Sequence, residues 1–342
     1  MTSDPDDPTR SSGSPSASCK DVLGHDGPSS ASDPVPTLRQ LVDGATVLLA
    51  QAGVASAQVD AVALAAHALD VPRLVLALAP DPLPDGFAAR YAALVERRCR
   101  REPLQHIVGR TGFRYLDLLV EPGVFVPRPE TETVAGHVVT EAARLVTDAN
   151  PSLGDEVSLP PLIVDLCCGT GAVALAVATE VPGVRVVAVD VDAHAVDLAR
   201  RNAAAVGLAP GTLEVRQGDV RDPDLLADLA GTVDVVVANP PYIPPDQVPV
   251  DPEVRDHDPD VALYGGGADG LDVPRATLAA AVRLLAPGGL LVMEHAEVQA
   301  AAVRAAAEAA GLVEVRTEPD LTGRPRAVVA RAPAPPTCGL SV

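Results

Sequence analysis

The chain has 342 residues and a formal net charge of -20, from 46 acidic and 26 basic side chains. A chain this acidic repels phosphate backbones, so naked nucleic acid is disfavoured as a partner, and a protein or a small molecule is favoured. Hydrophobic residues make up 47% of the sequence but aromatic residues only 2%, so we expect one or two domains with cores of Ala, Val and Leu.

The cysteines also limit the classes of protein to consider. Their number is odd and no pair has C-x-x-C spacing; they are Cys19, Cys99, Cys167, Cys168 and Cys338. This predicts a reduced, cytoplasmic chain without a zinc or other metal site. The Asp-, Ser- and Pro-rich start predicts no signal peptide. The most apolar N-terminal stretch is interrupted by Asp60, His67, Asp70 and Arg73, so no membrane span is expected.

A disordered tail and a helical domain are predicted first. Residues 1–36 are too rich in Ser, Pro, Asp and Gly to order themselves. Residues 37–101 form a helical domain, which we expect to recognise the substrate. Thr37 caps its first helix and Gly53 ends it; the apolar face is Leu38, Leu41, Val42, Ala45, Leu48 and Leu49. Ser56 caps the second helix, whose predicted stripe is Val59, Val62, Ala63 and Ala66.

The apolar period changes between residues 102 and 127, which predicts a β-hairpin linker. Its two strands are expected at 112–120 and 123–126. A helix should follow, because Pro129 and the acidic residues beside it suit a helix start. We expect that helix to run to about Val146.

Residues 128–331 alternate strand and helix, which predicts an α/β domain with a doubly wound, largely parallel sheet closed by a C-terminal antiparallel hairpin. The expected strands are 162–166, 185–189, 212–215, 233–238, 290–294, 312–317 and 326–331, with helices near 273–286 and 298–310. The long polar segment 243–272 is predicted to be a functional loop. Residues 332–342 are predicted to be a second disordered tail.

A glycine turn follows the first predicted strand of this domain, in Asp165-Leu166-Cys167-Cys168-Gly169-Thr170-Gly171. Glycines let the backbone approach a ligand closely, and the next helix offers free N–H groups at its start. Asp190 stands just past the second strand, where an acidic residue commonly binds ribose hydroxyls. These features indicate a nucleotide-type ligand.

The run from 233 to 238 is a buried strand that ends at Asn239-Pro240-Pro241-Tyr242. Two prolines forbid continuation of the strand and make a rigid turn that carries an amide and an aromatic ring. In an open α/β sheet, ligands bind at this end of the strands. Asn-Pro-Pro is also ordinary turn chemistry, but the glycine turn upstream favours a site.

Several stretches resemble a known family. The glycine turn with Asp190 and Asp219 resembles the cofactor loops of class I S-adenosylmethionine-dependent methyltransferases, and Asn-Pro-Pro-Tyr is similar to the signature of those that methylate planar nitrogens. The segments 102–109 and 125–132, with Phe113, resemble the linker of the HemK/PrmC-type protein-glutamine methyltransferases that modify peptide-chain release factors. The Gly-Ala-Asp-Gly-Leu stretch at 267–271 extends the similarity, which covers about 37–331.

The resemblance implies a SAM-dependent protein-glutamine methyltransferase with a Rossmann-like fold. It implies that the Asn239 side-chain oxygen and the Pro240 carbonyl accept the two N–H groups of the glutamine amide. Tyr242 and Phe113 would form the apolar walls around that amide, with Pro241 beside them. The implied substrate is the Gly-Gly-Gln motif of release factors, and we expect a monomer that binds neither nucleic acid nor membrane.

The resemblance also assigns the cofactor contacts. Asp165 would support the amino-acid end of S-adenosylmethionine or its loop, Asp190 its ribose and Asp219 its adenine. The remaining predicted contacts are Cys167, Gly169, Gly171 and Asn239. The family loop usually reads D-L-G-T-G-S-G, so Cys167 replaces its first glycine and is compatible with a divergent paralogue that uses another acceptor.

Other interpretations remain open at this point. Asn-Pro-Pro-Tyr also fits a methyltransferase of exocyclic base nitrogens, where the ring stacks on a flipped base, or one of a ribosomal-protein glutamine. The glycine turn with Asp190 satisfies the loose dinucleotide pattern of an oxidoreductase, and a non-enzymatic binding module is a further alternative. Phe113 could be plain core, Asp219 a helix cap, and His295 a partly exposed strand-end histidine instead of a base.

Overall fold

The computed structural model describes residues 36–78, 80–149 and 159–334. The chain divides into two compact units, Met1–Val108 and Gly109–Val342, and the division lies inside the predicted linker. Most of the two predicted tails lies outside the described residues. Ala332 is described and is buried, and its backbone exchanges hydrogen bonds with Gly288 and Gly289, so the ordered sheet extends beyond the predicted start of the C-terminal tail.

The described part of the first unit contains α2 (Leu38–Gln51), α3 (Ala57–Ala68), η1 (Leu76–Leu78), α4 (Phe87–Cys99) and α5 (Leu104–Val108). The predicted first helix is confirmed. Thr37 caps α2 in a capping box with Gln40, and all six residues of the predicted stripe are buried. Phe87 and Tyr91 of α4 stack inside this unit with ring centroids 5.5 Å apart.

The predicted stripe of α3 is only partly right, because Ala66 is buried and Val62 packs against the core, but the first residue of the stripe is not buried. Val59 is 69% exposed, and Asp60 is buried in its place. The burial of Asp60 is compensated by an ion pair, because the Nε of Arg98 on α4 donates to Asp60 Oδ2 at 2.8 Å. Ser56 does not cap the helix through its side chain but donates its hydroxyl proton to Asp60 at 2.7 Å.

The predicted hairpin is present, but its two strands lie at other residues than the sequence predicts. β1 (Arg110–Phe113) and β2 (Leu116–Leu119) pair antiparallel, and residues 123–126 form no strand. The turn falls at Arg114, inside the run that the apolar pattern presents as one strand. Tertiary contacts hold it there: the Arg114 amide donates to Glu132 Oε1 at 3.1 Å, and its guanidinium pairs with Glu180.

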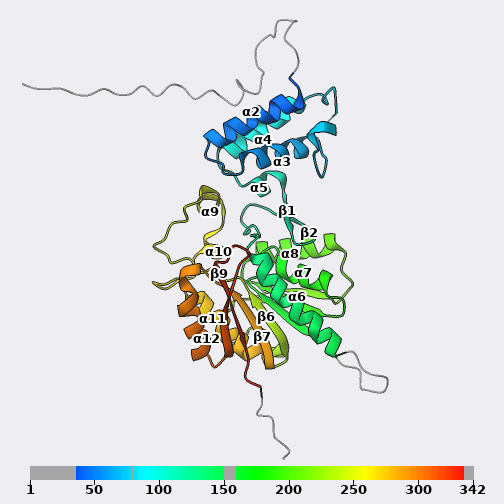
Figure 1. Ribbon diagram of the computed structural model, residues 1–342. Coiled ribbons are helices and arrows are strands. Elements are labelled where there is room, and N and C mark those ends of the chain that lie inside the picture. The colour runs from blue at the N-terminus through cyan, green and yellow to red at the C-terminus, as the bar shows by residue number, and fades with distance from the viewer. Residues whose placement is uncertain (1–35, 79, 150–158, 335–342) are drawn as a thin grey trace, which may run out of the picture. The chain divides into compact units, whose positions relative to one another are not determined.

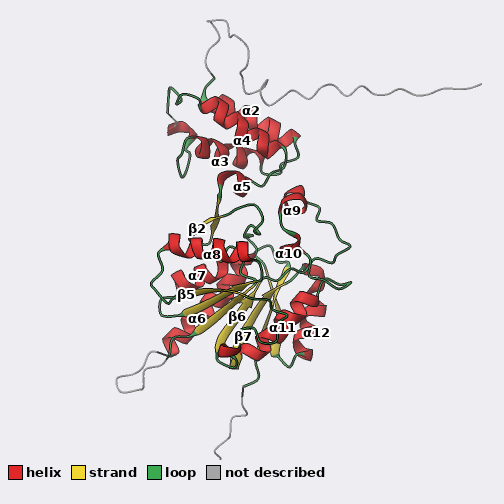
Figure 2. Ribbon diagram, turned by 180° about the vertical axis from the view of Figure 1, so that it is seen from behind, coloured by secondary structure: helices red, strands yellow, loops and turns green. Residues whose placement is uncertain are grey.

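The second unit is built on a seven-stranded sheet in the order β5-β4-β3-β6-β7-β9-β8. Its strands are β3 (Leu162–Leu166), β4 (Arg185–Asp190), β5 (Leu213–Gln217), β6 (Val233–Ala238), β7 (Leu285–Glu294), β8 (Val313–Pro319) and β9 (Pro325–Arg331). The first five in this order are parallel, and β9 runs antiparallel to both β7 and β8. The predicted fold class is confirmed (Figures 1 and 2).

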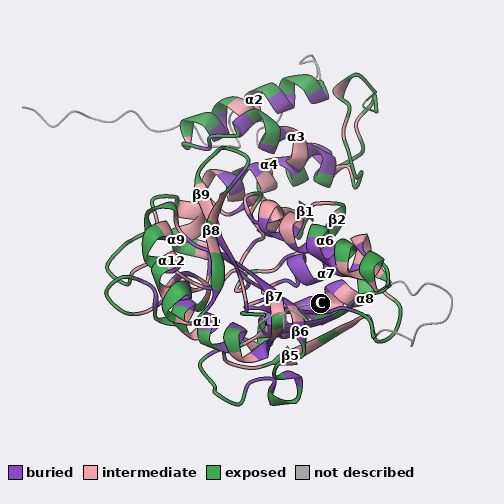
Figure 3. Ribbon diagram, turned by 60° about the horizontal axis from the view of Figure 1, so that its bottom comes forward, coloured by how far each residue is buried: buried purple, intermediate pink, exposed green. Residues whose placement is uncertain are grey.

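Helices cover both faces of the sheet, which explains why its central strands are continuous apolar runs. On one face, α6 (Thr131–Asp148), α7 (Ala172–Glu180) and α8 (Ala193–Val206) cover Ile163, Val235 and Val237. On the other, α11 (Asp272–Leu284) and α12 (Ala300–Ala309), with the short η2 (Ala227–Leu229), lie along the face of Val164 and Val236, and η3 (Glu297–Gln299) directly precedes α12. Figure 3 shows the purple, buried strands between these layers.

The segment 243–272 is not a simple loop. It contains α9 (Pro252–His257) and α10 (Asp260–Leu263), and it returns to the sheet region through an isolated bridge between Ile243 and Tyr264. Both helices are too short to leave a clear periodic signal in the sequence. No helix among residues 36–334, the masked positions aside, is long and apolar enough to cross a membrane.

Candidate active site

A cavity of about 440 Å³ lies within the second unit at the carboxyl ends of the parallel strands, a volume in the usual range of small-molecule sites. The predicted site residues that line it are Asp165, Cys167, Gly169, Asp190, Asp219, Asn239, Pro240, Pro241 and Tyr242. They come from the ends of four neighbouring strands, so the sheet brings together stretches up to 77 residues apart in the chain. Gly171 and Phe113 do not line the cavity.

The glycine turn joins β3 to α7. Gly169 has a φ of +54°, and the space where a Cβ would stand is open, so its backbone can lie directly against a ligand. Its amide donates to Asp190 Oδ2 at 2.8 Å. Gly171 has another role: as the N-cap of α7 it lets this helix approach α8, because an added Cβ would stand 3.2 Å from the Cβ of Ala199.

Cys167 adopts the left-handed conformation, with a φ of +59°. This region favours glycine and costs other residues roughly 1–2 kcal/mol, so the backbone keeps the shape that a glycine would take although cysteine occupies the position. The side chain lines the cavity. Burial raises the pKa of the Cys167 thiol well above its ordinary value, so the group is a neutral wall and no nucleophile at neutral pH.

Two carboxyl groups stand close to this turn. Asp165 on β3 is buried and accepts a hydrogen bond from the amide of Ala174 in α7 at 3.0 Å. Burial raises the pKa of Asp165 to about 7, and the nearby charge of Asp190 acts in the same direction. Burial also raises the pKa of Asp190, whose Oδ1 accepts from the amide of Asp192 at 3.0 Å.

Asp219 lines the cavity beyond β5. No helix begins there, so it is not a helix cap; its carboxylate accepts from the amide and the Nε of Arg221, both at 2.9 Å. This pairing lowers the pKa of Asp219. The group is therefore an ionised acceptor at neutral pH.

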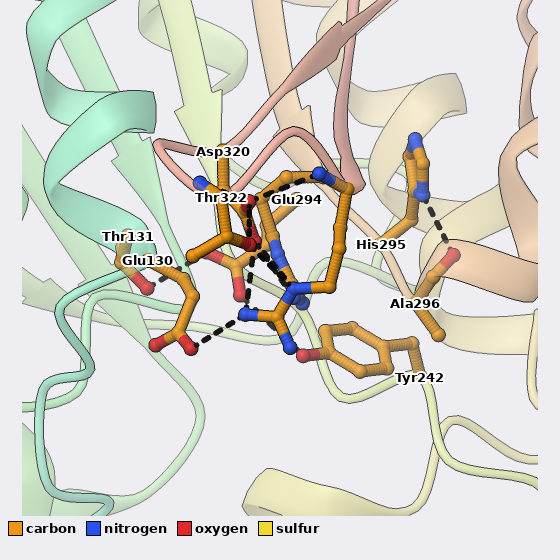
Figure 4. A network of polar contacts seen from close by, with 10 residues as sticks. Glu130, Thr131, Tyr242, Glu294, His295, Ala296, Asp320 and Thr322 are labelled. Carbon is orange, nitrogen blue, oxygen red and sulfur yellow. Dashed lines mark hydrogen bonds and ion pairs between the residues drawn. The ribbon is translucent and has the colours of Figure 1, made fainter.

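Asn239 follows β6 directly, and its side-chain amide is held by a chain of hydrogen bonds. Its Nδ2 donates to Thr131 Oγ1 at 3.3 Å, and Thr131 in turn donates its hydroxyl proton to Glu294 Oε2 at 2.7 Å. The other oxygen of Glu294 accepts from the Tyr242 hydroxyl at 3.4 Å. Figure 4 shows Thr131, Tyr242 and Glu294 converging from three different elements.

Sequence reasoning missed Thr131 and Glu294 as site residues. Both line the cavity, and both carried a signal that could have been used. Glu294 is a carboxylate that ends a strongly apolar strand and stays buried with 2% exposure. Thr131 lies within the Arg-Pro-Glu-Thr-Glu stretch, whose proline and acidic residues predict a helix start but whose threonine was given no role.

The glycine-rich stretch at 265–270, which contains Gly-Ala-Asp-Gly, supports the Asn-Pro-Pro-Tyr turn through close backbone contact. A Cβ on Gly265 would stand 2.6 Å from the Pro241 carbonyl oxygen, and one on Gly270 would stand 2.3 Å from that of Tyr242. Gln299 ties both stretches, because its Nε2 donates to the Tyr242 carbonyl at 2.8 Å and to that of Asp269 at 3.0 Å. Only glycine permits this approach.

Phe113 lies in the hydrophobic core with Leu118 and Val134, with 1% of its surface exposed, so the structure does not bring it together with Asn239. The cavity is lined by the ring of Phe125 instead, and the Arg128 guanidinium lies 4.8 Å from the centroid of that ring. Sequence reasoning placed Phe125 in the motif but assigned it no role.

The expectation of a partly exposed His295 is wrong. The residue is fully buried, its Nδ1 lies 2.9 Å from the Ala296 carbonyl oxygen, and it is absent from the cavity lining. Burial lowers its pKa. In the part of the chain that the structure describes, no three His, Cys, Asp or Glu side chains are grouped as metal ligands.

The cavity fits S-adenosylmethionine. Gly169 provides open backbone at a helix start, where the carboxylate end of an amino acid can bind. The Asp190 carboxylate stands at the end of β4, the position that suits ribose hydroxyls. Asp165, Asp190 and Asp219 together make the wall acidic, which complements a cationic sulfonium and ammonium.

Comparisons with known proteins agree with this geometry. The family model "PrmC N-terminal domain" matches residues 40–109, and "Methyltransferase small domain" matches residues 156–251. The chain is 46% identical to a release factor glutamine methyltransferase of Mycolicibacterium smegmatis, covering 86% of this chain and 97% of that one. It is 47% identical to the protein of that name from Streptomyces coelicolor, covering 85% and 96%.

One similar protein carries another name. A 4-amino-L-phenylalanine/4-methylamino-L-phenylalanine methyltransferase of Streptomyces pristinaespiralis is 40% identical, over 81% of this chain and 89% of that one. By its identity and coverage, the chain belongs to the release factor glutamine methyltransferase family, the S-adenosylmethionine-dependent enzymes that the sequence motifs indicated.

Proposed function

We propose that this enzyme transfers the methyl group of S-adenosylmethionine to the side-chain amide nitrogen of the glutamine in the Gly-Gly-Gln motif of a peptide-chain release factor. The observation that carries the proposal is the orientation of Asn239 beside the cofactor cavity. Because its Nδ2 is committed to Thr131, the Oδ1 atom is available to an acceptor amide.

S-adenosylmethionine supplies an electrophilic methyl group on a sulfonium, so the protein needs no strong general base. A glutamine amide is a poor nucleophile because its nitrogen lone pair is delocalised over the carbonyl. The protein must therefore hold the nitrogen in line with the methyl group, and orientation of this kind supplies at most about 7–11 kcal/mol.

Asn239 and Pro240 supply that orientation. The Asn239 Oδ1 and the Pro240 carbonyl oxygen accept the two N–H groups of the substrate amide, which aims the nitrogen and stabilises the positive charge that develops on it. Tyr242 and Phe125 form the apolar walls of the acceptor side; Phe125 takes the role that the sequence gave to Phe113, because it lines the cavity. Pro241 keeps the turn rigid.

The cofactor side has its own set of residues. Asp190 binds the ribose hydroxyls, Asp219 accepts from the adenine amino group, and Gly169 lies against the amino-acid end. Asp165 supports this end through its contact with the first turn of α7. Cys167 forms a wall of the same side. Recognition of the release factor by the helical domain at 37–101 is part of the proposal and rests on its family match.

One similar protein is named as a methyltransferase of 4-amino-L-phenylalanine, so the experiment must identify which molecule accepts the methyl group. The purified chain is incubated with methyl-labelled S-adenosylmethionine and one acceptor at a time: a release factor, the same factor with the motif glutamine changed to glutamate, 4-amino-L-phenylalanine, or ribosomal RNA. Label in the unaltered release factor alone supports the proposal. Label in the free amino acid or the RNA, with none in the release factor, contradicts it.

A further inference from the structure

Three polar side chains behind the acceptor site form a chain of hydrogen bonds that has a single direction when Glu294 is ionised. Asn239 Nδ2 donates to Thr131 Oγ1 at 3.3 Å, and Thr131 donates to Glu294 Oε2 at 2.7 Å. A threonine hydroxyl has a single proton. Once that proton is given to the carboxylate, the Thr131 oxygen can only accept from Asn239.

This direction matters because the oxygen and nitrogen of an asparagine amide are nearly the same size and can exchange places. With Oδ1 toward the acceptor, Asn239 accepts from the substrate N–H groups. With the amide flipped, its NH₂ would face the substrate NH₂, and two donors would oppose each other. Productive binding therefore requires that something fixes the orientation of Asn239.

We infer that Thr131 and Glu294 are positioning residues that fix the orientation of the Asn239 amide, and so direct its oxygen toward the acceptor nitrogen. The inference rests on the proposed function and adds two residues to which no role has been given. Glu294 is 2% exposed and Thr131 is 5% exposed, so these hydrogen bonds lie in a largely buried environment, where they are stronger than in water.

Glu294 also holds the second side of the acceptor site. Its Oε1 accepts from the Tyr242 hydroxyl at 3.4 Å, so one carboxylate connects the amide and the ring of the Asn-Pro-Pro-Tyr turn. Thr131 opens α6 and Glu294 ends β7, which places both supports on regular elements. Rigid elements hold a reacting group more exactly than loops do.

This positioning of the Asn239 amide requires that Glu294 is ionised. If the carboxyl group were protonated, it could donate to Thr131, whose hydroxyl would then be free to donate to Asn239 and stabilise the flipped amide. The charged and titratable groups that face Glu294 are Arg326 of β9, Glu130 before α6 and Tyr242 after β6; His295 is its neighbour on the chain. Burial raises the pKa of Glu294 to about 7, so the ionised fraction increases as pH rises through neutrality.

The test uses the full-length enzyme and two substitutions that alter the direction of the chain. Glu294→Gln keeps the shape but can both donate and accept, so it no longer selects one orientation. Thr131→Val keeps the volume but removes the hydroxyl, and Thr131→Ser restores it. Thr133→Val is the matched control, because its hydroxyl lies two residues along α6, buried and without a hydrogen-bond partner among the described residues.

Each variant is first checked for folding by thermal unfolding and for cofactor binding by calorimetry; kcat and KM for the release factor are then measured at saturating cofactor from pH 5.5 to 9. We expect Glu294→Gln and Thr131→Val to lower kcat about 10²-fold, the loss typical of a misplaced reacting group, with an unchanged cofactor Kd. Thr131→Ser and Thr133→Val should keep the kcat of the wild type. The wild-type kcat should rise with pH through about 7, and this rise should disappear in Glu294→Gln.

A folded, cofactor-binding Glu294→Gln enzyme with wild-type kcat and the same pH profile would overturn the inference. So would a Thr133→Val enzyme that loses as much activity as Thr131→Val, since the effect would then be a general one of α6. Failure of the proposed function looks different, because the wild-type enzyme itself would leave the release factor unmethylated while binding the cofactor.

Discussion

The carboxylate of Asp190 and the amide of Gly169 connect the ends of β4 and β3, with the Gly169 N–H donating to Asp190 Oδ2 at 2.8 Å. The residue that the sequence assigned to the ribose therefore also holds the glycine turn in place. Its second oxygen accepts from the Asp192 amide, just before α8. Cofactor binding and loop shape thus depend on one carboxylate.

This double role predicts a large effect of Asp190→Ala on cofactor affinity. Hydrogen bonds to a charged group are worth about 1.5–3 kcal/mol, so losing one such contact should raise the Kd for S-adenosylmethionine about 10- to 100-fold. Calorimetric titration measures it. Asp197→Ala removes the same charge from the exposed side of α8 and serves as the control; an equal loss in both variants would mean that net charge, and not this contact, sets the affinity.

Asn239→Ala should separate binding from chemistry. The substitution removes the acceptor of the substrate amide, and loss of one preorganised hydrogen-bonding group of this kind lowers kcat about 10²–10³-fold. The cofactor Kd should stay close to that of the wild type. Gln247→Ala removes an exposed amide from the segment that follows and should leave kcat unchanged. If Asn239→Ala kept its kcat, Asn239 would not have the assigned role.

Gly270→Ala should disable the acceptor site from outside it. The new Cβ would stand 2.3 Å from the Tyr242 carbonyl oxygen, so the turn must move, and a displacement near 1 Å can cost about 10²-fold in rate. Gly211→Ala is the matched control, because Gly211 also has a positive φ but open space around it. In both variants the left-handed backbone should cost about 1–2 kcal/mol of unfolding free energy, measured in urea, and Gly270→Ala should lose more because its Cβ also meets backbone atoms.

Gly211→Ala should keep its kcat, whereas Gly270→Ala should lose it. A Gly270→Ala enzyme with normal kcat would show that the contact between this stretch and the Asn-Pro-Pro-Tyr turn is dispensable. An inactive Gly211→Ala enzyme would mean that strain alone, at any position, is enough to abolish activity. Either result would remove the assigned support role of Gly270.

The sheet of this protein could be predicted because its signal is local. Strands such as β3 and β6 are apolar runs bounded by turn residues, and helices on both faces make such runs continuous. The glycine turn and Asn-Pro-Pro-Tyr could be placed at strand ends by the same argument. The parallel order of the sheet then brought Asp165, Asp190 and Asn239 to one cavity.

What the sequence did not reveal depends on contacts between distant residues. The burial of Asp60 on α3 is compensated by Arg98, which lies 38 residues after it, and the hairpin turn at Arg114 is held by Glu180. Thr131 and Glu294 are in contact although they lie 163 residues apart in the chain, so no local sequence pattern predicts that they support Asn239. Phe113 and Phe125 are both aromatic and close in sequence, and only the packing of β1 decides that the first is core.

The buried Asp165 predicts a pH dependence of stability. Its pKa is raised to about 7, so between about pH 4 and pH 7 the folded protein binds a proton that the unfolded chain has released. Stability conferred by this proton is complete at low pH and is lost as pH rises through about 7. The wild type should therefore lose unfolding free energy relative to Asp165→Asn over this window, by a few kcal/mol in total.

Urea unfolding at pH 4.5, 6 and 7.5, without cofactor, measures this difference. Asp43→Asn, an exposed acid of α2, is the control and should show no such trend. A difference between wild type and Asp165→Asn that is constant with pH would contradict the raised pKa. A difference that grows in favour of the wild type as pH rises would mean that the pKa of Asp165 is lowered instead of raised.

The most direct test of the central claim is peptide mass mapping of a release factor after incubation with this enzyme and methyl-labelled S-adenosylmethionine. We predict one methyl group on the side-chain nitrogen of the Gly-Gly-Gln glutamine, and none when Asn239→Ala replaces the wild-type enzyme. A wild-type enzyme that binds the cofactor yet leaves this glutamine unmodified, or places the methyl group on another residue, would contradict the account.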